Sequence, residues 1–231
     1  MRGLARRNLV MLVAGAAVVA GAALSTAWVQ KYRYRPYLHE KLYLPSGKFV
    51  REFSLGYREI AADMVWLSAV QYYGDFRKGN GDLRYFRGLI DIVTSLDPHF
   101  IFAYLFGGIV VSEDAGAFED GLNILKRGMS HNPNSWQLPF EIGFLNLVNR
   151  RDFALAGRYF ELASKLPGAP EYAERFAAFV YSRAGDSDSS IRLWEEYRDH
   201  TEDPFLKELA DGYLQKLKSE TAGKKAGSNA W

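Results

Sequence analysis

Few side chains in this sequence have the type and spacing that catalysis or metal binding requires. The four histidines lie far apart, at His39, His99, His131 and His200. None of them has a second histidine or a carboxylate at a spacing typical of metal ligands. The chain contains no cysteine, which excludes disulfides, thiolate metal ligands and cysteine nucleophiles. Since no nucleophile pairs with a candidate base either, we expect no catalytic site, no metal site and no cofactor.

Two short segments have some features of ligand-binding loops. Gly79–Asp82 is glycine-rich, as a phosphate loop is, but no Gly-Lys-Ser/Thr follows it and no strand precedes it. Asp186–Ser190 has the alternating oxygen atoms of a calcium loop, but it lacks the glycine and the terminal glutamate of an EF-hand. A turn between two helices explains the first segment, and capping of the following helix explains the second.

The net charge of +2 is unevenly divided along the chain. Residues 1–35 hold six basic residues and no acidic one, which leaves −4 for the remainder. A nucleic-acid partner would require a basic surface on the folded part, and none is evident, so we expect no nucleic-acid binding. Hydrophobic residues make up 48% and aromatic residues 15% of the chain. This composition indicates a folded domain with a sizeable core.

The N-terminal region has the pattern of a membrane segment. Leu9–Val29 carries no charge, and its length is just sufficient to span a hydrocarbon core of about 30 Å. Basic residues flank it, and tyrosines follow it as at a membrane interface. We predict a retained single-pass anchor in the inner (plasma) membrane, with the domain on the periplasmic or external side because a short basic tail is not translocated. A cleaved signal peptide is the alternative, since Ser25-Thr26-Ala27 resembles a cleavage site.

Prolines punctuate the rest of the chain at nearly even intervals. Pro98, Pro133 and Pro167 are 35 and 34 residues apart, and Pro204 follows after 37 more. Proline ends a helix, and a period near 34 residues is typical of repeated helix–turn–helix units. Strand-like alternation of apolar and polar residues is hard to find. The pattern therefore predicts an all-α fold.

The unit between Pro133 and Pro167 resembles a tetratricopeptide repeat (TPR). Gly143 lies in its first helix, and Ala156, Phe160 and Ala163 fall on one face of its second helix. One extra residue enlarges the turn between the two helices, at residues 149–152. The other units match the family pattern less well, and the second has Gly121 and Gly128 where TPR proteins usually have alanine.

The resemblance covers residues 58–218. It implies an α-solenoid of about four TPR-like helical hairpins, closed by a C-terminal capping helix. Around it we expect a signal-anchor or transmembrane helix in residues 1–29, an interfacial linker and lead-in helix in residues 30–57, and a disordered tail in residues 219–231. A non-repeating helical bundle is the alternative fold.

TPR proteins bind partners in a concave groove lined by the first helix of each unit. Carried over unit by unit, the resemblance implies a protein-binding groove lined by Met64, Leu67, Gln71, Phe102, Leu105, Ile109, Gln137, Phe140, Phe144 and Leu147. This lining is aromatic and aliphatic and lacks the basic and amide residues with which some TPR proteins clamp a carboxylate. It therefore suits an amphipathic or hydrophobic helix, such as a segment of a membrane protein. Packing of the same residues against another helix of this chain is the alternative.

These expectations together describe a binding protein and not an enzyme. We expect a membrane-anchored TPR-like scaffold or adaptor that binds partner proteins and helps to hold or assemble a membrane protein complex. Two alternatives remain open: a permanent structural subunit of a large membrane assembly, and a secreted binding domain released by signal cleavage. An enzyme whose site is not evident from the sequence is a third.

Overall fold

The computed structural model describes residues 15, 19–26 and 56–228. They belong to two compact units, Met1–Tyr43 and Leu44–Trp231, which are treated separately here. In the first unit residues 19–26 are helical. No helix in the described part of the chain is long and apolar enough to cross a membrane.

Most of the predicted membrane segment lies outside the described residues. The described helical stretch, residues 19–26, covers only part of the predicted span 9–29. The predicted linker and lead-in helix also lie outside the description, apart from Gly56 and Tyr57. The anchor therefore stays a prediction.

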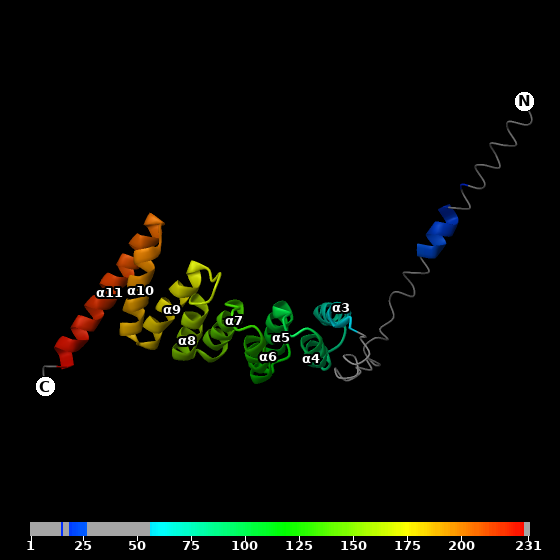
Figure 1. Ribbon diagram of the computed structural model, residues 1–231, viewed down its shortest axis with the longest axis horizontal. Helices are drawn as coiled ribbons and strands as arrows, with labels where there is room; N and C mark the ends of the chain where they lie inside the picture. The colour runs from blue at the N-terminus through cyan, green and yellow to red at the C-terminus, as the bar shows by residue number, and fades with distance from the viewer. Residues whose placement is uncertain (1–14, 16–18, 27–55, 229–231) are drawn as a thin grey trace, which may run out of the picture. The chain divides into compact units, whose positions relative to one another are not determined.

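The second unit consists of helices joined by short turns (Figure 1). In chain order they are α3 (Arg58–Arg77), α4 (Phe86–Leu96), α5 (Ile101–Glu113), α6 (Phe118–His131), α7 (Gln137–Leu145), the π-helical turn η2 (Asn146–Arg150), α8 (Phe153–Ser164), α9 (Glu171–Ala184), α10 (Ser187–His200) and α11 (Pro204–Ser228). Residues 56–228 contain no strand. The all-α class predicted from the sequence is confirmed.

The helices pair into successive hairpins. α3 packs on α4, α5 on α6, α7 on α8, and α9 on α10, and each hairpin also packs on the next. In the view of Figure 1, α3, α5 and α7 lie above α4, α6 and α8. This stacking confirms the solenoid-like arrangement of hairpins that the proline spacing predicted. α11 packs on α10 and closes the C-terminal end.

Proline, glycine and aspartate set the ends of these helices. α4 ends two residues before Pro98, and α11 begins at Pro204, where the missing N–H of proline costs no hydrogen bond. Asp152 caps α8 by accepting a hydrogen bond from the backbone N–H of Leu155 at 2.9 Å. Asp186 caps α10 in the same way, so the capping role predicted for Asp186–Ser190 is confirmed, although the helix begins at Ser187.

The extra residue of the third hairpin is accommodated in a π-helical turn. η2 continues α7, and Arg151 then adopts a left-handed conformation with φ of 54°. The backbone N–H of Asp152 closes the turn by donating to the carbonyl of Asn146 at 3.2 Å. Asn146 is fully buried. The extra residue therefore lies in the π-helical turn between α7 and α8.

Glycines let α5 and α6 approach very closely. A Cβ atom on Gly121 would overlap Oγ of Ser112 and would lie 2.5 Å from the carbonyl oxygen of Gly108. A Cβ atom on Gly128 would lie 2.8 Å from the ring of Tyr104. No side chain fits at such distances, which explains why this hairpin has glycine where the TPR pattern usually has alanine.

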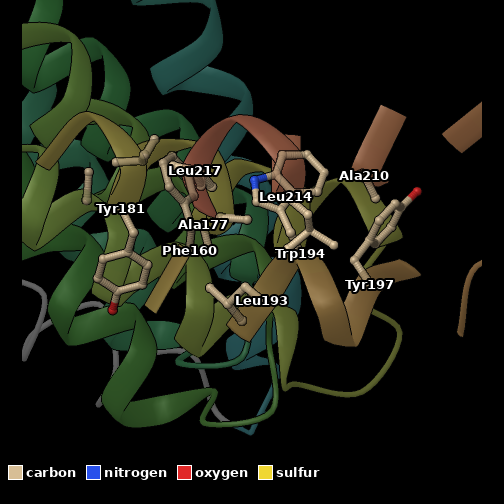
Figure 2. Close-up of a cluster of buried hydrophobic side chains, with 12 residues drawn as sticks. Phe160, Ala177, Tyr181, Leu193, Trp194, Tyr197, Ala210, Leu214 and Leu217 are labelled. Carbon is tan, nitrogen blue, oxygen red and sulfur yellow. The ribbon is translucent and has the colours of Figure 1, made fainter. Parts of the chain in front are cut away.

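A continuous apolar core joins α8, α9, α10 and α11 (Figure 2). The predicted face of α8 is buried, since Ala156, Phe160 and Ala163 all have 0% exposure. The indole of Trp194 stacks on Tyr213 of α11 with ring centroids 4.6 Å apart. The labelled members of this core are Phe160, Ala177, Tyr181, Leu193, Trp194, Tyr197, Ala210, Leu214 and Leu217.

The last helix is longer than the sequence suggested. α11 continues to Ser228, whereas we expected it to end at Lys218 and to be followed by a disordered tail. No proline interrupts residues 219–228, and lysine, alanine and glutamate favour helix there. The hydroxyl of Thr221 also donates to the carbonyl of Leu217, one turn earlier.

Candidate protein-binding surface

The first helices of the hairpins expose large apolar side chains to solvent. On α3 these include Met64 and Leu67, with 67% and 60% of their surface exposed. We call the whole set the first-helix surface; its members are Ile60, Met64, Leu67, Val70, Phe102, Phe144, Val148, Tyr172, Phe176 and Phe179. Scattered apolar residues on a surface are ordinary, but these recur on the first helix of every hairpin, which makes the first helices the candidate interaction site.

The second helices of the hairpins expose far fewer large apolar side chains. Within residues 56–228, Leu162 of α8 is the one large apolar side chain that α4, α6, α8 and α10 leave exposed. The asymmetry cannot come from a shortage of apolar residues, because α4 alone buries Phe86, Leu89 and Ile90. Most of the large apolar side chains that the four hairpins expose therefore belong to the first helices.

Helical spacing gathers these side chains into stripes. Ile60, Met64 and Leu67 are separated by four and three residues, which places them on one face of α3. The same spacing aligns Tyr172, Phe176 and Phe179 on α9. Each first helix thus buries one face in its hairpin and presents another outward.

The residues predicted to line the groove lie on α3, α5, α7 and η2, and each of the ten is at least partly exposed. Two of them, Phe140 and Leu147, also pack against the buried core. The exposed ones are Met64, Leu67, Gln71, Phe102 and Phe144. The half-buried ones are Leu105, Ile109, Gln137, Phe140 and Leu147. Their role in binding stays a prediction.

Aromatic contacts support the surface between α3 and α5. The indole of Trp66 lies 5.3 Å from the ring of Phe100 and 5.5 Å from that of Phe106. Phe102 contacts both Trp66 and Phe106. Each such pair contributes about 0.5–1.5 kcal/mol beyond its buried area. The contacts with Trp66 and Phe106 therefore hold the exposed ring of Phe102 in place.

A second aromatic group joins α7 to α9. The ring of Phe140 lies 5.5 Å from Tyr172 and 5.6 Å from Phe176, both on α9. Beneath it, the centroid of the buried Phe160 ring is 4.9 Å away. Phe140 is thus partly a core residue and partly a surface residue.

Sequence reasoning missed the contribution of α9. It assigned groove positions to the first three hairpins only, while Tyr172, Phe176 and Phe179 are between 37% and 41% exposed. The signal was present in the sequence, because their spacing of four and three residues is that of one helix face.

Two carboxylates interrupt the apolar stripes of α5 and α7. Glu113 follows Leu105 and Ile109 on one face of α5, and Glu141 shares a face of α7 with Phe144. Asn149 donates a hydrogen bond to Glu113 at 2.5 Å. Burial, and then the nearby charge of Glu113, raise the pKa of Glu141 above its ordinary value. The aromatic and aliphatic lining predicted from the sequence includes neither residue.

Two arginines of α9 lie over aromatic rings. The guanidinium of Arg183 lies over the ring of Phe179 at 5.9 Å, and that of Arg175 lies over Tyr197 at 5.6 Å. Such contacts hold a cation against an aromatic face. α9 also carries Glu171 and Glu174 in its first turn, so this helix bears charges of both signs.

The described histidines lie at separate places in the array. Nδ1 of His99 lies 3.3 Å from Oδ1 of Asn132, and His131 stacks on Tyr104. His200 lies 3.2 Å from a carboxylate oxygen of Glu174. The described residues include no group of three or more histidines and carboxylates placed to hold a metal ion.

The glycine-rich segment Gly79–Asp82 forms the turn between α3 and α4. Gly79 and Gly81 have φ values of 81° and 105°, which favour glycine. Asp82 accepts a hydrogen bond from the backbone N–H of Arg84 at 3.0 Å. The segment therefore has the geometry of a helix–helix turn, as predicted.

Comparisons with known proteins show structural similarity to solved structures but do not assign the chain to a family. No family model matches the chain, and no curated protein matches it. Among solved structures it is similar to a crystal structure of MamA, with a TM-score of 0.42 and 18% identity over 66% of this chain and 95% of that one. A second structure of MamA gives 0.41 and 20% identity, covering 66% and 90%. Yeast Tom70 gives 0.36 and 16% identity, covering 76% of this chain and 43% of Tom70. These values are too low to assign a family, and the fold assignment rests on the helix packing described above.

Proposed function

We propose that this chain is a non-catalytic, membrane-anchored scaffold that binds partner proteins through the first-helix surface. In that role it holds or assembles a membrane protein complex. The observation that carries the proposal is the asymmetry between the helices. α3 and α9 expose apolar stripes and α5 and α7 one large apolar side chain each, whereas α4, α6, α8 and α10 together expose Leu162 alone. A stripe of this kind along one side of a hairpin array suits a helix or extended segment of another protein.

The energetics of covering this surface favour binding. Burial of apolar area stabilises a complex by about 25 cal/mol per Å², so covering about 400 Å² contributes roughly 10 kcal/mol before the cost of association. Association and side-chain ordering offset much of that gain. The aromatic contacts of Trp66 and Phe140 reduce the ordering cost, because they hold the exposed rings in place before a partner arrives.

The apolar segment Leu9–Val29 supports membrane anchoring. An anchor would raise the effective concentration of the surface near membrane partners. The test is carbonate extraction of native membranes, with the intact mass of the protein and its protease sensitivity measured from each side. We expect the full-length mass in the membrane fraction and digestion from the periplasmic or external side only. A soluble product that lacks the N-terminal segment would contradict the anchor and favour the secreted alternative.

The binding role is tested by crosslinking and gentle-detergent co-purification of the full-length protein from native membranes. Wild type is compared with Phe144→Arg and with Leu162→Arg. The two residues are 41% and 42% exposed, but they lie on a first and a second helix respectively. We expect defined membrane proteins to co-purify with wild type and Leu162→Arg and to be lost with Phe144→Arg. Equal loss in both variants, or unfolding of Phe144→Arg, would count against the surface.

A permanent structural subunit would present the same apolar surface. The two roles differ in what happens when the partner is removed. A scaffold that exchanges partners stays folded and monomeric after mild dissociation, whereas a permanent subunit aggregates. Light scattering of the dissociated full-length protein in lipid nanodiscs separates them, and we expect the monomer.

A further inference from the structure

Glu141 occupies an unusual place on the first-helix surface. It lies three residues before Phe144 and four after Gln137, so the three side chains share one face of α7. Phe144 is 41% exposed and Val148, which follows in η2, is 53% exposed. The carboxylate is half-buried beside these open apolar side chains.

Within residues 56–228, the side chain of Glu141 makes no hydrogen bond and no ion pair. Other carboxylates of this array that are withdrawn from solvent are paired. Glu161, whose side chain is 16% exposed, accepts hydrogen bonds from Tyr181 and Arg192, and Glu174, at 14%, pairs with His200. A charge that is partly removed from water without a partner is costly, which is why such charges are normally paired.

The fold gives Glu141 no structural task that would explain its charge. It lies beyond the first turn of α7 and caps no helix end. The charge of Glu113, on α5, also opposes its ionisation. Glutamine would fill the same space in the array without these costs, so no contact within residues 56–228 accounts for a carboxylate here.

We propose that Glu141 is a specificity-determining residue that forms an ion pair with a lysine or arginine of a partner helix. The other contacts of that helix with α5 and α7 are apolar. The inference rests on the proposed function, since it names the partner chemistry of the same surface. Charge complementarity is the argument for this occupant: Glu141 and Glu113 make the α5–α7 part acidic, and its other side chains are apolar apart from the uncharged Gln137 and Asn149. An apolar helix with a basic residue in its buried face would satisfy both.

The test uses two amphipathic helical peptides that differ at one position in the centre of the apolar face, lysine in one and norleucine in the other. Their affinities for the full-length protein in lipid nanodiscs are measured by fluorescence anisotropy. We expect wild type to prefer the lysine peptide about fivefold, the range of a partly exposed ion pair. Glu141→Gln should abolish the preference and keep the affinity for the norleucine peptide. The matched control is Glu208→Gln on α11, an exposed carboxylate away from the surface, which should keep the preference.

The outcomes separate this inference from the proposed function. Equal affinity of wild type for both peptides, or a preference that survives Glu141→Gln, would overturn the inference while the norleucine peptide still reports binding. If neither peptide binds wild type, the proposed function fails and the inference with it.

A carbodiimide, which joins a carboxylate directly to a lysine amine, identifies the occupant in the same sample. We expect an amide between Glu141 and the lysine of the peptide. An amide to a lysine of the same chain, or to that of an isotope-labelled second copy, would assign the surface to the chain itself and overturn the inference.

Discussion

Two phenylalanines of the third hairpin show how differently its two helices use the same side chain. Phe160 of α8 is fully buried, whereas Phe144 of α7 is 41% exposed. The residue before Phe144 is Gly143, on which a Cβ atom would lie 3.1 Å from the ring of Phe160. Gly143 therefore lies on the face of α7 that packs against the core, while the next residue, Phe144, lies on the exposed face. Packing between helices thus stabilises the array and leaves the outer face of the first helices free for other contacts.

Truncation of Phe160 and Phe144 to alanine should give the largest difference in the free energy of unfolding between the buried and the exposed face. We expect Phe160→Ala to lower the free energy of unfolding by about 4 kcal/mol, because it removes a buried ring and leaves a cavity. Phe144→Ala, its counterpart on the exposed side, should cost less than about 1 kcal/mol. Urea denaturation of the full-length protein, followed by circular dichroism, measures both. Similar losses for the two variants would mean that Phe144 is also a core residue.

Glycine packing offers a second way to probe the interior. Gly121→Ala should lower the free energy of unfolding by about 3 kcal/mol, because the added methyl group meets backbone atoms of α5 that have no room to move. Gly212→Ala is the control: no heavy atom lies within 4 Å of its Cβ position on α11. That change should raise the stability by up to about 1 kcal/mol, since alanine favours helix over glycine. A tolerated Gly121→Ala would show that α5 and α6 are not packed as described.

A polar contact within the C-terminal part should have a smaller, pH-dependent effect. Burial alone would raise the pKa of Glu161, but hydrogen bonds from Lys165, Arg192 and Tyr181 outweigh it and lower the pKa to about 2. The ionised form therefore stabilises the fold, fully so above the ordinary value of 4.5. We expect Glu161→Gln to cost about 2 kcal/mol at neutral pH.

The difference between wild type and Glu161→Gln should shrink as the pH falls from 4.5 toward 2. Denaturation curves recorded over this range measure it. A difference that is independent of pH would show that the charge of Glu161 is not what stabilises the contact.

The smallest effect is expected at Glu141, on the exposed side of the comparison. Burial and the charge of Glu113 raise its pKa, so the folded state favours the neutral form and ionised Glu141 destabilises it. Glu141→Gln should therefore raise the free energy of unfolding by less than about 1 kcal/mol at neutral pH. The gain should disappear as the pH falls below the ordinary value for glutamate. Glu208→Gln should change nothing, and a loss of stability in Glu141→Gln would mean that the carboxylate has a structural role.

The fold could be predicted because its signals are local. The proline period and the Gly143, Ala156 and Phe160 pattern report which faces pack, and hairpins of neighbouring helices follow from that. The groove positions on α3, α5, α7 and η2 come from the TPR resemblance, and their role in binding stays a prediction. The unpaired state of the Glu141 carboxylate could not be predicted from the sequence, because it depends on side chains of α5 that are remote in sequence. The length of α11 was missed because composition alone was taken to indicate disorder in residues 219–228.

The most direct test of the account is photo-crosslinking in native membranes from two matched positions. Benzoylphenylalanine replaces Phe144 in one sample of the full-length protein and Leu162 in the other, two sites of nearly equal exposure on α7 and α8. If the first-helix surface binds partner proteins, position 144 forms a crosslink to another protein that position 162 does not form. Equal crosslinking from both positions, or none from position 144, would contradict the account.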